Sequence, residues 1–104
     1  MHHINHIIFD LNSMPFVTED EQWDNFKVII EVLTERNYQI TLIRENLKQE
    51  SLWLDHPSVS VLISKQEDWK QLSQEKRLFL PNCCWITENS AFQKDLLQNQ
   101  VSFG

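Results

Sequence analysis

The apolar positions of this chain follow two spacings, one typical of buried strands and one typical of helix faces. Compact apolar runs predict strands. They lie at about residues 4–10, 38–43, 59–63, 83–86 and 101–103. Between these runs, apolar residues recur every three or four positions, which is the spacing of one helix face. The helical stretches lie at about residues 23–33, 47–54, 69–72 and 92–97.

Polar residues near the starts of the helical stretches support the same division. Three stretches are preceded by a Ser or Thr that is followed three positions later by Glu or Gln, a pattern that predicts a capping box. The pairs are Thr18 with Glu21, Ser64 with Glu67, and Ser90 with Gln93. The first helix is expected to end near Asn37, because Asn tolerates the left-handed conformation that ends many helices.

Strands that alternate with amphipathic helices predict an α/β fold. We expect a single Rossmann-like domain over residues 1–104, in three layers, with helices on both faces of a mostly parallel sheet of about five strands. The run at 59–63 is almost entirely apolar, which is typical of a parallel strand buried on both faces.

Charge and cysteine content narrow the possible partners. The chain of 104 residues carries a net charge of −6, which argues against a nucleic-acid or anionic membrane surface, because both need a basic patch. No apolar run approaches the roughly 20 residues of a membrane helix, and no signal-peptide pattern is visible. Cys83 and Cys84 are neighbours and cannot form a disulfide framework, so a cytoplasmic location is expected.

Glycine is almost missing from the chain, since Gly104 is the only one. Glycine-rich phosphate loops are therefore excluded, because they bring backbone N–H groups close to phosphate without an intervening Cβ. Left-handed turns are expected to fall on Asn or Asp, the other residue types that visit this conformation routinely.

Polar side chains follow each of the first four predicted strands. They are Asp10 and Asn12, Arg44 and Glu45, Ser64 and Lys65, and Thr87 with Glu88 and Asn89. The carboxyl ends of parallel strands meet at one edge of a sheet, where ligands bind in open α/β folds. Acids from the first and fourth strands would there supply oxygen ligands of the kind that Mg²⁺ prefers.

Two of these strand ends resemble motifs of the haloacid dehalogenase-like phosphohydrolase superfamily. Ile7-Ile8-Phe9-Asp10-Leu11-Asn12 is similar to its first motif, an apolar strand that ends in Asp-x-Asp. Trp85-Ile86-Thr87-Glu88 is similar to its last motif, an apolar strand followed by acids. The resemblance implies that Asp10 is the catalytic nucleophile and that Asp10 and Glu88 bind magnesium. It also implies a phosphorylated small molecule as ligand.

The chain departs from the family pattern at two positions. Asn12 occupies the place of the general acid and base, and an amide cannot transfer a proton at neutral pH. The second strand ends in Arg44 where the family has a phosphate-binding Ser or Thr, so Arg44 becomes the candidate phosphate ligand. We therefore expect weak or no phosphohydrolase activity.

Simpler roles remain open for the same residues. Asp10 could form a turn or cap a helix, and Glu88 could complement a helix dipole. Arg44 could pair with Glu45 or with Glu88.

The short helical stretch before Pro57 suggests a different function. Leu52, Trp53 and Leu54 are consecutive, so all three cannot face the same core. An exposed apolar patch would make this stretch an interaction surface for a second copy or another protein. The alternative is a short helix wedged into the core on both sides. A non-catalytic protein-interaction or dimerisation module is therefore the second hypothesis.

Overall fold

A computed structural model describes residues 3–14, 20–45 and 56–104 of the protein. Five strands and three α-helices alternate along these residues. They are β1 (His6–Asp10), α1 (Asp20–Glu35), β2 (Gln39–Arg44), β3 (Val59–Ile63), α2 (Trp69–Glu75), β4 (Cys83–Ile86), α3 (Ser90–Gln98) and β5 (Ser102–Phe103). One-turn 3₁₀ helices follow β1, as η1 (Leu11–Ser13), and precede α2, as η4 (Gln66–Asp68). The predicted strand positions are confirmed.

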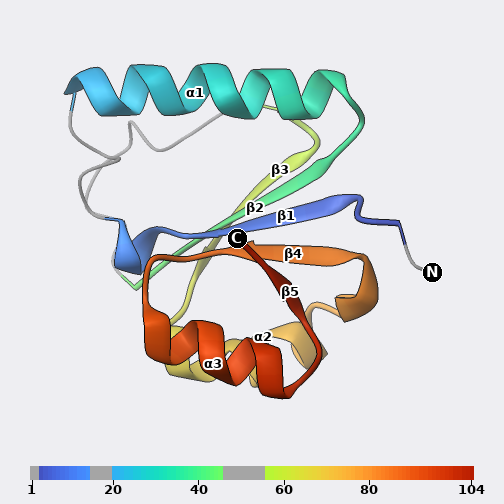
Figure 1. The fold of residues 1–104 in the computed structure, drawn as a ribbon. Helices are drawn as coiled ribbons and strands as arrows, with labels where there is room; N and C mark the ends of the chain where they lie inside the picture. Colours follow the sequence, from blue (N-terminus) through green and yellow to red (C-terminus); the bar gives the residue numbers. More distant parts are fainter. Residues whose placement is uncertain (1–2, 15–19, 46–55) are drawn as a thin grey trace.

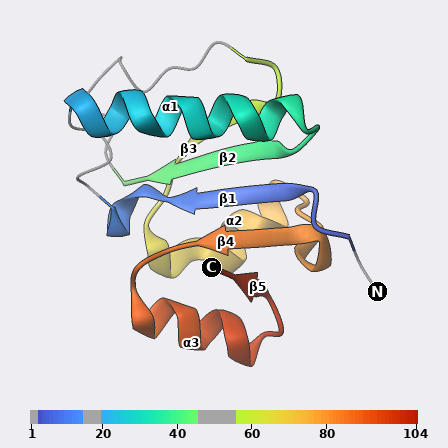
Figure 2. The same ribbon diagram turned by 45° about the horizontal axis from the view of Figure 1, so that its top comes forward.

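The strands form one parallel sheet in the order β3-β2-β1-β4-β5 (Figures 1 and 2). The predicted α/β fold with a five-stranded parallel sheet is therefore confirmed. β1 lies at the centre, between β2 and β4. None of the described helices is both long and apolar enough to cross a membrane.

Alternate residues of the central strands pack against different helices, because successive side chains of a strand point to opposite faces. Phe9 and Leu42 pack with Trp23, Phe26 and Ile30 of α1. On the other face, Ile8, Ile43 and Trp85 pack with Trp69 and Leu72 of α2 and with Phe92 and Leu96 of α3. Figure 1 shows α1 on one side of the sheet and α2 and α3 on the other.

The prediction that the third strand is buried on both faces is wrong. β3 lies at the edge of the sheet and pairs only with β2 among the described strands. Its last residue, Ile63, is 63% exposed. Apolar content shows that a segment favours a strand, but it does not fix the strand's place in the sheet.

Two of the predicted capping boxes are also wrong. Ser64 does not cap a helix, because its hydroxyl group donates to the carbonyl of Lys65 and η4 intervenes before α2. At α3 the cap lies one residue earlier than predicted, since Asn89 Oδ1 accepts from the backbone N–H groups of Ala91 and Phe92. The third box, Thr18 with Glu21, rests on side chains outside the described part of the chain.

Each of the three helices is followed, two residues after its last one, by a residue in the left-handed conformation, and only one of these is Asn. The residues are Asn37 (φ 69°), Arg77 (φ 54°) and Gln100 (φ 59°). In each case the backbone N–H group of the following residue donates to a carbonyl in the last turn of the helix. The pairs are Tyr38 with Leu33, Leu78 with Ser73, and Val101 with Leu96. Asn37 confirms the predicted end of α1, whereas Arg77 and Gln100 contradict the expectation that Asn or Asp makes every left-handed turn.

Candidate functional site

The sheet has a topological switch point between β1 and β4. From β1 the strand order runs through β2 and β3 on one side and through β4 and β5 on the other. Ligands of open α/β folds bind outside the carboxyl ends of the strands at such a point. Here Asp10, the last residue of β1, meets Thr87, which follows β4, and Thr87 Oγ1 donates to Asp10 Oδ2 at 2.9 Å.

The Asp10 carboxylate is buried, with 1% of the residue exposed, and it accepts hydrogen bonds from separate segments. The backbone N–H group of Asn12 donates to Oδ1 at 3.2 Å. Gln66 Nε2 donates to Oδ2 at 2.5 Å, beside the Thr87 hydroxyl group. Every one of these donors is neutral. A buried carboxylate is costly unless it is hydrogen-bonded, and these contacts offset that cost.

More hydrogen bonds surround this carboxylate. Gln66 Oε1 accepts from Asn89 Nδ2 at 2.9 Å, so Gln66 joins Asp10 to the start of α3. Ser13 Oγ donates to the Asp10 carbonyl at 2.9 Å and accepts from the Glu88 N–H group at 3.0 Å. We call this set the Asp10 network. It comprises Asp10, Asn12, Ser13, Gln66, Thr87 and Asn89.

Asn12 connects the loops that follow β2 and β3. Its Nδ2 donates to the Ser64 carbonyl at 3.1 Å, and its Oδ1 accepts from the Glu45 N–H group at 2.7 Å. Aspartate could make only the second contact, because an ionised carboxylate has no proton to donate. An amide at this position is therefore explained by its contacts.

The other predicted site residues lie away from the Asp10 carboxylate. Leu42 packs on the α1 face and Ile43 on the opposite face, so strand alternation places Arg44 on the α1 face. Asp10 faces the other way, beside Ile43 and Trp69. Arg44 Nη1 is buried without a hydrogen-bond partner, and no ion pair of Arg44 is found among the described residues. Its predicted phosphate contact stays a prediction.

Glu88 is exposed, and its backbone N–H group contacts the network by donating to Ser13 Oγ. The described residues contain no group of three or more His, Cys, Asp or Glu side chains that could hold a metal ion. Gln66 and Thr87 both donate to Asp10 Oδ2, whereas Oδ1 accepts, among the described residues, from the Asn12 N–H group alone, and the magnesium contacts of Asp10 and Glu88 stay a prediction. Leu52, Trp53 and Leu54 lie outside the described residues.

A polar depression of about 270 Å³ lies beside the network, and we call it the edge depression. Its lining residues are Asn12, Ser13, Glu45, Lys65, Gln66, Glu67 and Asn89. Asp10 is not among them; it borders a separate space beside Trp69 and Trp85. A ligand in the edge depression would therefore meet amide and hydroxyl groups, one ammonium group and two carboxylates.

Sequence reasoning missed Gln66 and undervalued Asn89. Nothing in the local spacing distinguishes Gln66 from other polar residues, because its partner Asp10 is 56 positions away. Asn89 did carry a signal, since Asn is a preferred N-cap and this one directly precedes a helical stretch.

Comparison of this chain with protein-family models, with curated proteins and with solved structures found no match. The function is therefore argued from its own residues.

Proposed function

We propose that this chain is a haloacid dehalogenase-like domain that binds a small polar ligand at the edge depression and does not turn over phosphate esters. The burial of Asp10 and the hydrogen bonds that its carboxylate already accepts carry this proposal. An aspartate that attacks phosphorus must present a free oxygen to its substrate. Asp10 is 1% exposed and its oxygens accept from Asn12, Gln66 and Thr87.

The neighbours of Asp10 support the absence of turnover. Asn12 cannot transfer a proton, and its amide is already engaged with Ser64 and Glu45. Phosphoryl transfer to Asp10 Oδ2 would require Gln66 and Thr87 to release this oxygen, which would deprive the half-buried Gln66 Nε2 of its acceptor.

The lining of the edge depression indicates the class of ligand. Lys65 attracts an anionic group, such as the phosphate or carboxylate of a small molecule, whereas Glu45 and Glu67 accept hydrogen bonds from hydroxyl or amino groups. The volume of about 270 Å³ is slightly smaller than that of typical ligand pockets, which have about 300–1,000 Å³. A small hydroxylated monoanion fits both properties better than a nucleotide.

The catalytic half of the proposal is tested by phosphatase assays with p-nitrophenyl phosphate and Mg²⁺. The wild-type chain and the Asp10→Asn variant are expected to give the same background rate. Asn12→Asp should not restore turnover, because Asp10 stays covered. Mg²⁺-dependent hydrolysis by the wild type that is lost in Asp10→Asn would overturn the proposal, and so would its appearance in Asn12→Asp.

The binding half is tested by NMR titration of the ¹⁵N-labelled chain with inorganic phosphate. The side-chain amide signals of Asn12, Gln66 and Asn89 should shift, and Lys65→Gln should weaken binding. Lys94→Gln removes the same charge from an exposed position on α3 and should leave the titration unchanged. Equal effects of the two lysine variants would mean that the affinity for phosphate depends on net charge and not on a site at Lys65.

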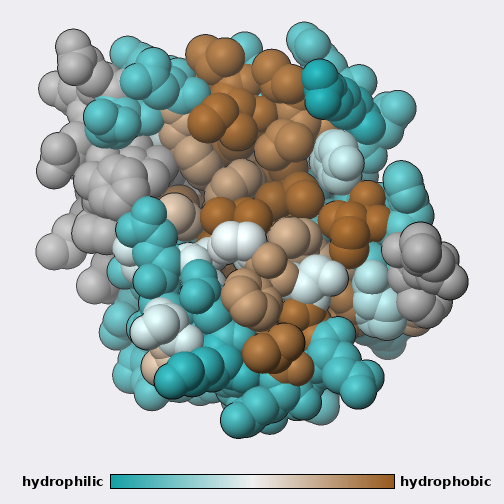
Figure 3. All heavy atoms as spheres, in the orientation of Figure 1, coloured by the Kyte–Doolittle hydropathy of each residue, from teal (hydrophilic) through white to brown (hydrophobic). Residues whose placement is uncertain are grey.

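Self-association is a second candidate function, favoured by one row of residues on α1. Val28 and Val32 are 57% and 42% exposed, and Ile29 beside them is 51% exposed. In Figure 3, apolar residues gather over α1 and continue across the middle of this face. An antiparallel copy of α1 centred on residue 30 would place Val28 against Val32 and Asp24 near Arg36 of the copy. Sedimentation should then show a dimer of the wild-type chain, and Val28→Lys should dissociate this dimer. A wild-type chain that stays monomeric at high concentration would exclude self-association through α1.

A further inference from the structure

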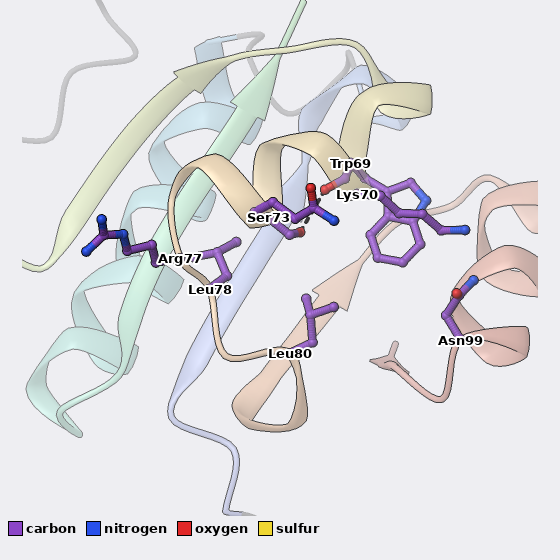
Figure 4. A pocket seen from close by; sticks show the side chains of 8 residues that line it. Trp69, Lys70, Ser73, Arg77, Leu78, Leu80 and Asn99 are labelled. Carbon is purple, nitrogen blue, oxygen red and sulfur yellow. Dashed lines mark hydrogen bonds between the residues drawn. The ribbon is translucent and has the colours of Figure 1, made fainter.

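A groove runs along α2 on the face of the sheet that α2 and α3 cover (Figure 4). Its volume is about 350 Å³, and we call it the α2 groove. It shares no lining residue with the edge depression. Figure 4 shows Leu78 and Leu80 beneath α2, while Lys70 points from the start of α2 toward Asn99 at the end of α3.

The floor of the α2 groove is formed by apolar side chains that are only partly buried. Leu78 and Leu80 pack against the core cluster that contains Trp69 and Trp85, yet both remain half-buried. Their remaining exposed surface faces the groove. Apolar surface in a concave site is favourably covered by an apolar ligand, because burial removes it from water.

The cation at one end of the groove is held in place without an acidic partner. Lys70 Nζ lies 5.6 Å from the centroid of the Trp69 ring, a cation–π arrangement that restricts the side chain. Within residues 3–14, 20–45 and 56–104, the one ion pair found joins Lys27 and Asp24. The ammonium group of Lys70 is therefore available to an anion.

Two acids of α2 and α3 have other partners. Asp95 Oδ2 accepts from Trp69 Nε1 at 2.8 Å, and Asp95 Oδ1 accepts from Asn99 Nδ2 at 3.3 Å. Glu75 accepts from Gln71 Nε2 at 3.1 Å on the outer side of α2. A second cation, Arg77, lines the far end of the groove, with its guanidinium turned away from Asn99 in Figure 4.

We propose that the α2 groove binds a small amphipathic carboxylate, with its apolar body over Leu78 and Leu80 and its carboxylate paired with Lys70. A monoanion is favoured over a phosphate dianion, because the chain has a net charge of −6 and one ammonium group faces this end. The groove volume suits a ligand of one or two rings. This site is independent of the function proposed for the edge depression.

The test uses 1-naphthylacetate as probe and the neutral 1-naphthylacetamide as its isosteric control, each titrated into the ¹⁵N-labelled full chain. Binding of the carboxylate should shift the Trp69 indole signal, the Asn99 side-chain amide and the backbone amides of Leu78 and Leu80. A charge-assisted contact should make the carboxylate bind about tenfold more tightly than the amide.

Lys70→Gln should reduce the affinity for naphthylacetate to that for the neutral amide. Lys76→Gln is the matched control, because it removes the same charge from the C-cap of α2 and Lys76 does not line the groove. Unchanged signals from β1 and α1 show that each variant is folded. Equal affinities for the two compounds, shifts confined to other regions, no binding at millimolar concentration, or equal effects of the two variants would each overturn the proposal.

Discussion

Replacing Thr87 by valine removes the hydroxyl group that joins the end of β4 to the Asp10 carboxylate. Valine keeps the shape of the buried side chain, which is 2% exposed, so the change tests the hydrogen bonds alone. Thr87 Oγ1 donates to Asp10 Oδ2 at 2.9 Å and accepts from the Asn89 N–H group at 3.2 Å. The variant leaves a buried charge with one donor fewer.

The expected loss is larger than for an ordinary buried hydroxyl group. A hydrogen bond to a charged group contributes about 1.5–3 kcal/mol to stability, whereas a neutral one contributes about 0.5–1.5 kcal/mol. Thr87→Val should therefore lower the free energy of unfolding by about 2–3 kcal/mol. For a domain of about 100 residues, that corresponds to a fall in Tm of at least about 8 °C.

Thr41→Val is the matched control for this measurement. Thr41 is 4% exposed, and its hydroxyl group lies 2.7 Å from His6 Nε2, a neutral partner when the imidazole is unprotonated. Urea unfolding at pH 7.5 should give a loss of about 1 kcal/mol for Thr41→Val. In an Asp10→Asn background, the extra cost of Thr87→Val should disappear, whereas the cost of Thr41→Val should not change. Equal losses for the two valine variants, or an unchanged cost in the Asn background, would refute this account of Asp10.

Three further predictions follow from single residues. Burial lowers the pKa of His6 from its usual 6.5, because the folded state favours the neutral imidazole. The stability that neutral His6 contributes is therefore complete above pH 6.5 and is lost as the pH falls below 6.5. When the pH is lowered from 7.5 to 5, the urea concentration at the midpoint of unfolding should therefore fall less for His6→Gln than for the wild type. Gln100→Gly should raise the free energy of unfolding by about 0.5–1 kcal/mol, because glycine adopts the φ of 59° without strain, and Asn37→Gly should gain less. Burial, with a smaller effect of Cys84, raises the pKa of Cys83 to about 11, so iodoacetamide at pH 8 should modify Cys83 about 100-fold more slowly in the folded chain than in urea.

The elements of this fold were predictable because their signals are local. The spacing of apolar residues depends on residues that are close in sequence. This spacing predicted the bounds of β1, β2, β3 and β4 to within one or two residues. The place of β3 in the sheet was not predictable in this way. Strand order depends on which strands pair across the whole chain, and the apolar run of β3 fits an edge as well as a centre.

The ends of α2 and α3 carried a signal other than glycine. Each left-handed residue is followed by an apolar one that packs back toward its helix: Tyr38, Leu78 and Val101. A hydrophobic residue just after the left-handed position is a regular part of this helix ending. In a chain with one glycine, this second half of the pattern is the more useful guide, and it would have located Arg77 and Gln100.

The position of Asp10 was predictable from the sequence, but its contacts were not. An apolar run ending in an acid places that acid at the carboxyl edge of a parallel sheet. Gln66 and Thr87 reach it from 56 and 77 positions away, and such contacts form only when the whole sheet is assembled. Reading the strand end as a nucleophile therefore left out the groups that decide whether Asp10 can react.

The chemistry of those groups favours a structural role for Asp10. Its carboxylate accepts from one backbone amide, one side-chain amide and one hydroxyl group, none of which changes charge at neutral pH. Asn12 and Gln66 also bind other loops, so freeing Asp10 for a reaction would break contacts well beyond the carboxylate. A charge that holds several loops together contributes to folding rather than to turnover. The two roles separate cleanly in Gln66→Ala, which uncovers one Asp10 oxygen: under the structural account it lowers stability and creates no phosphatase activity.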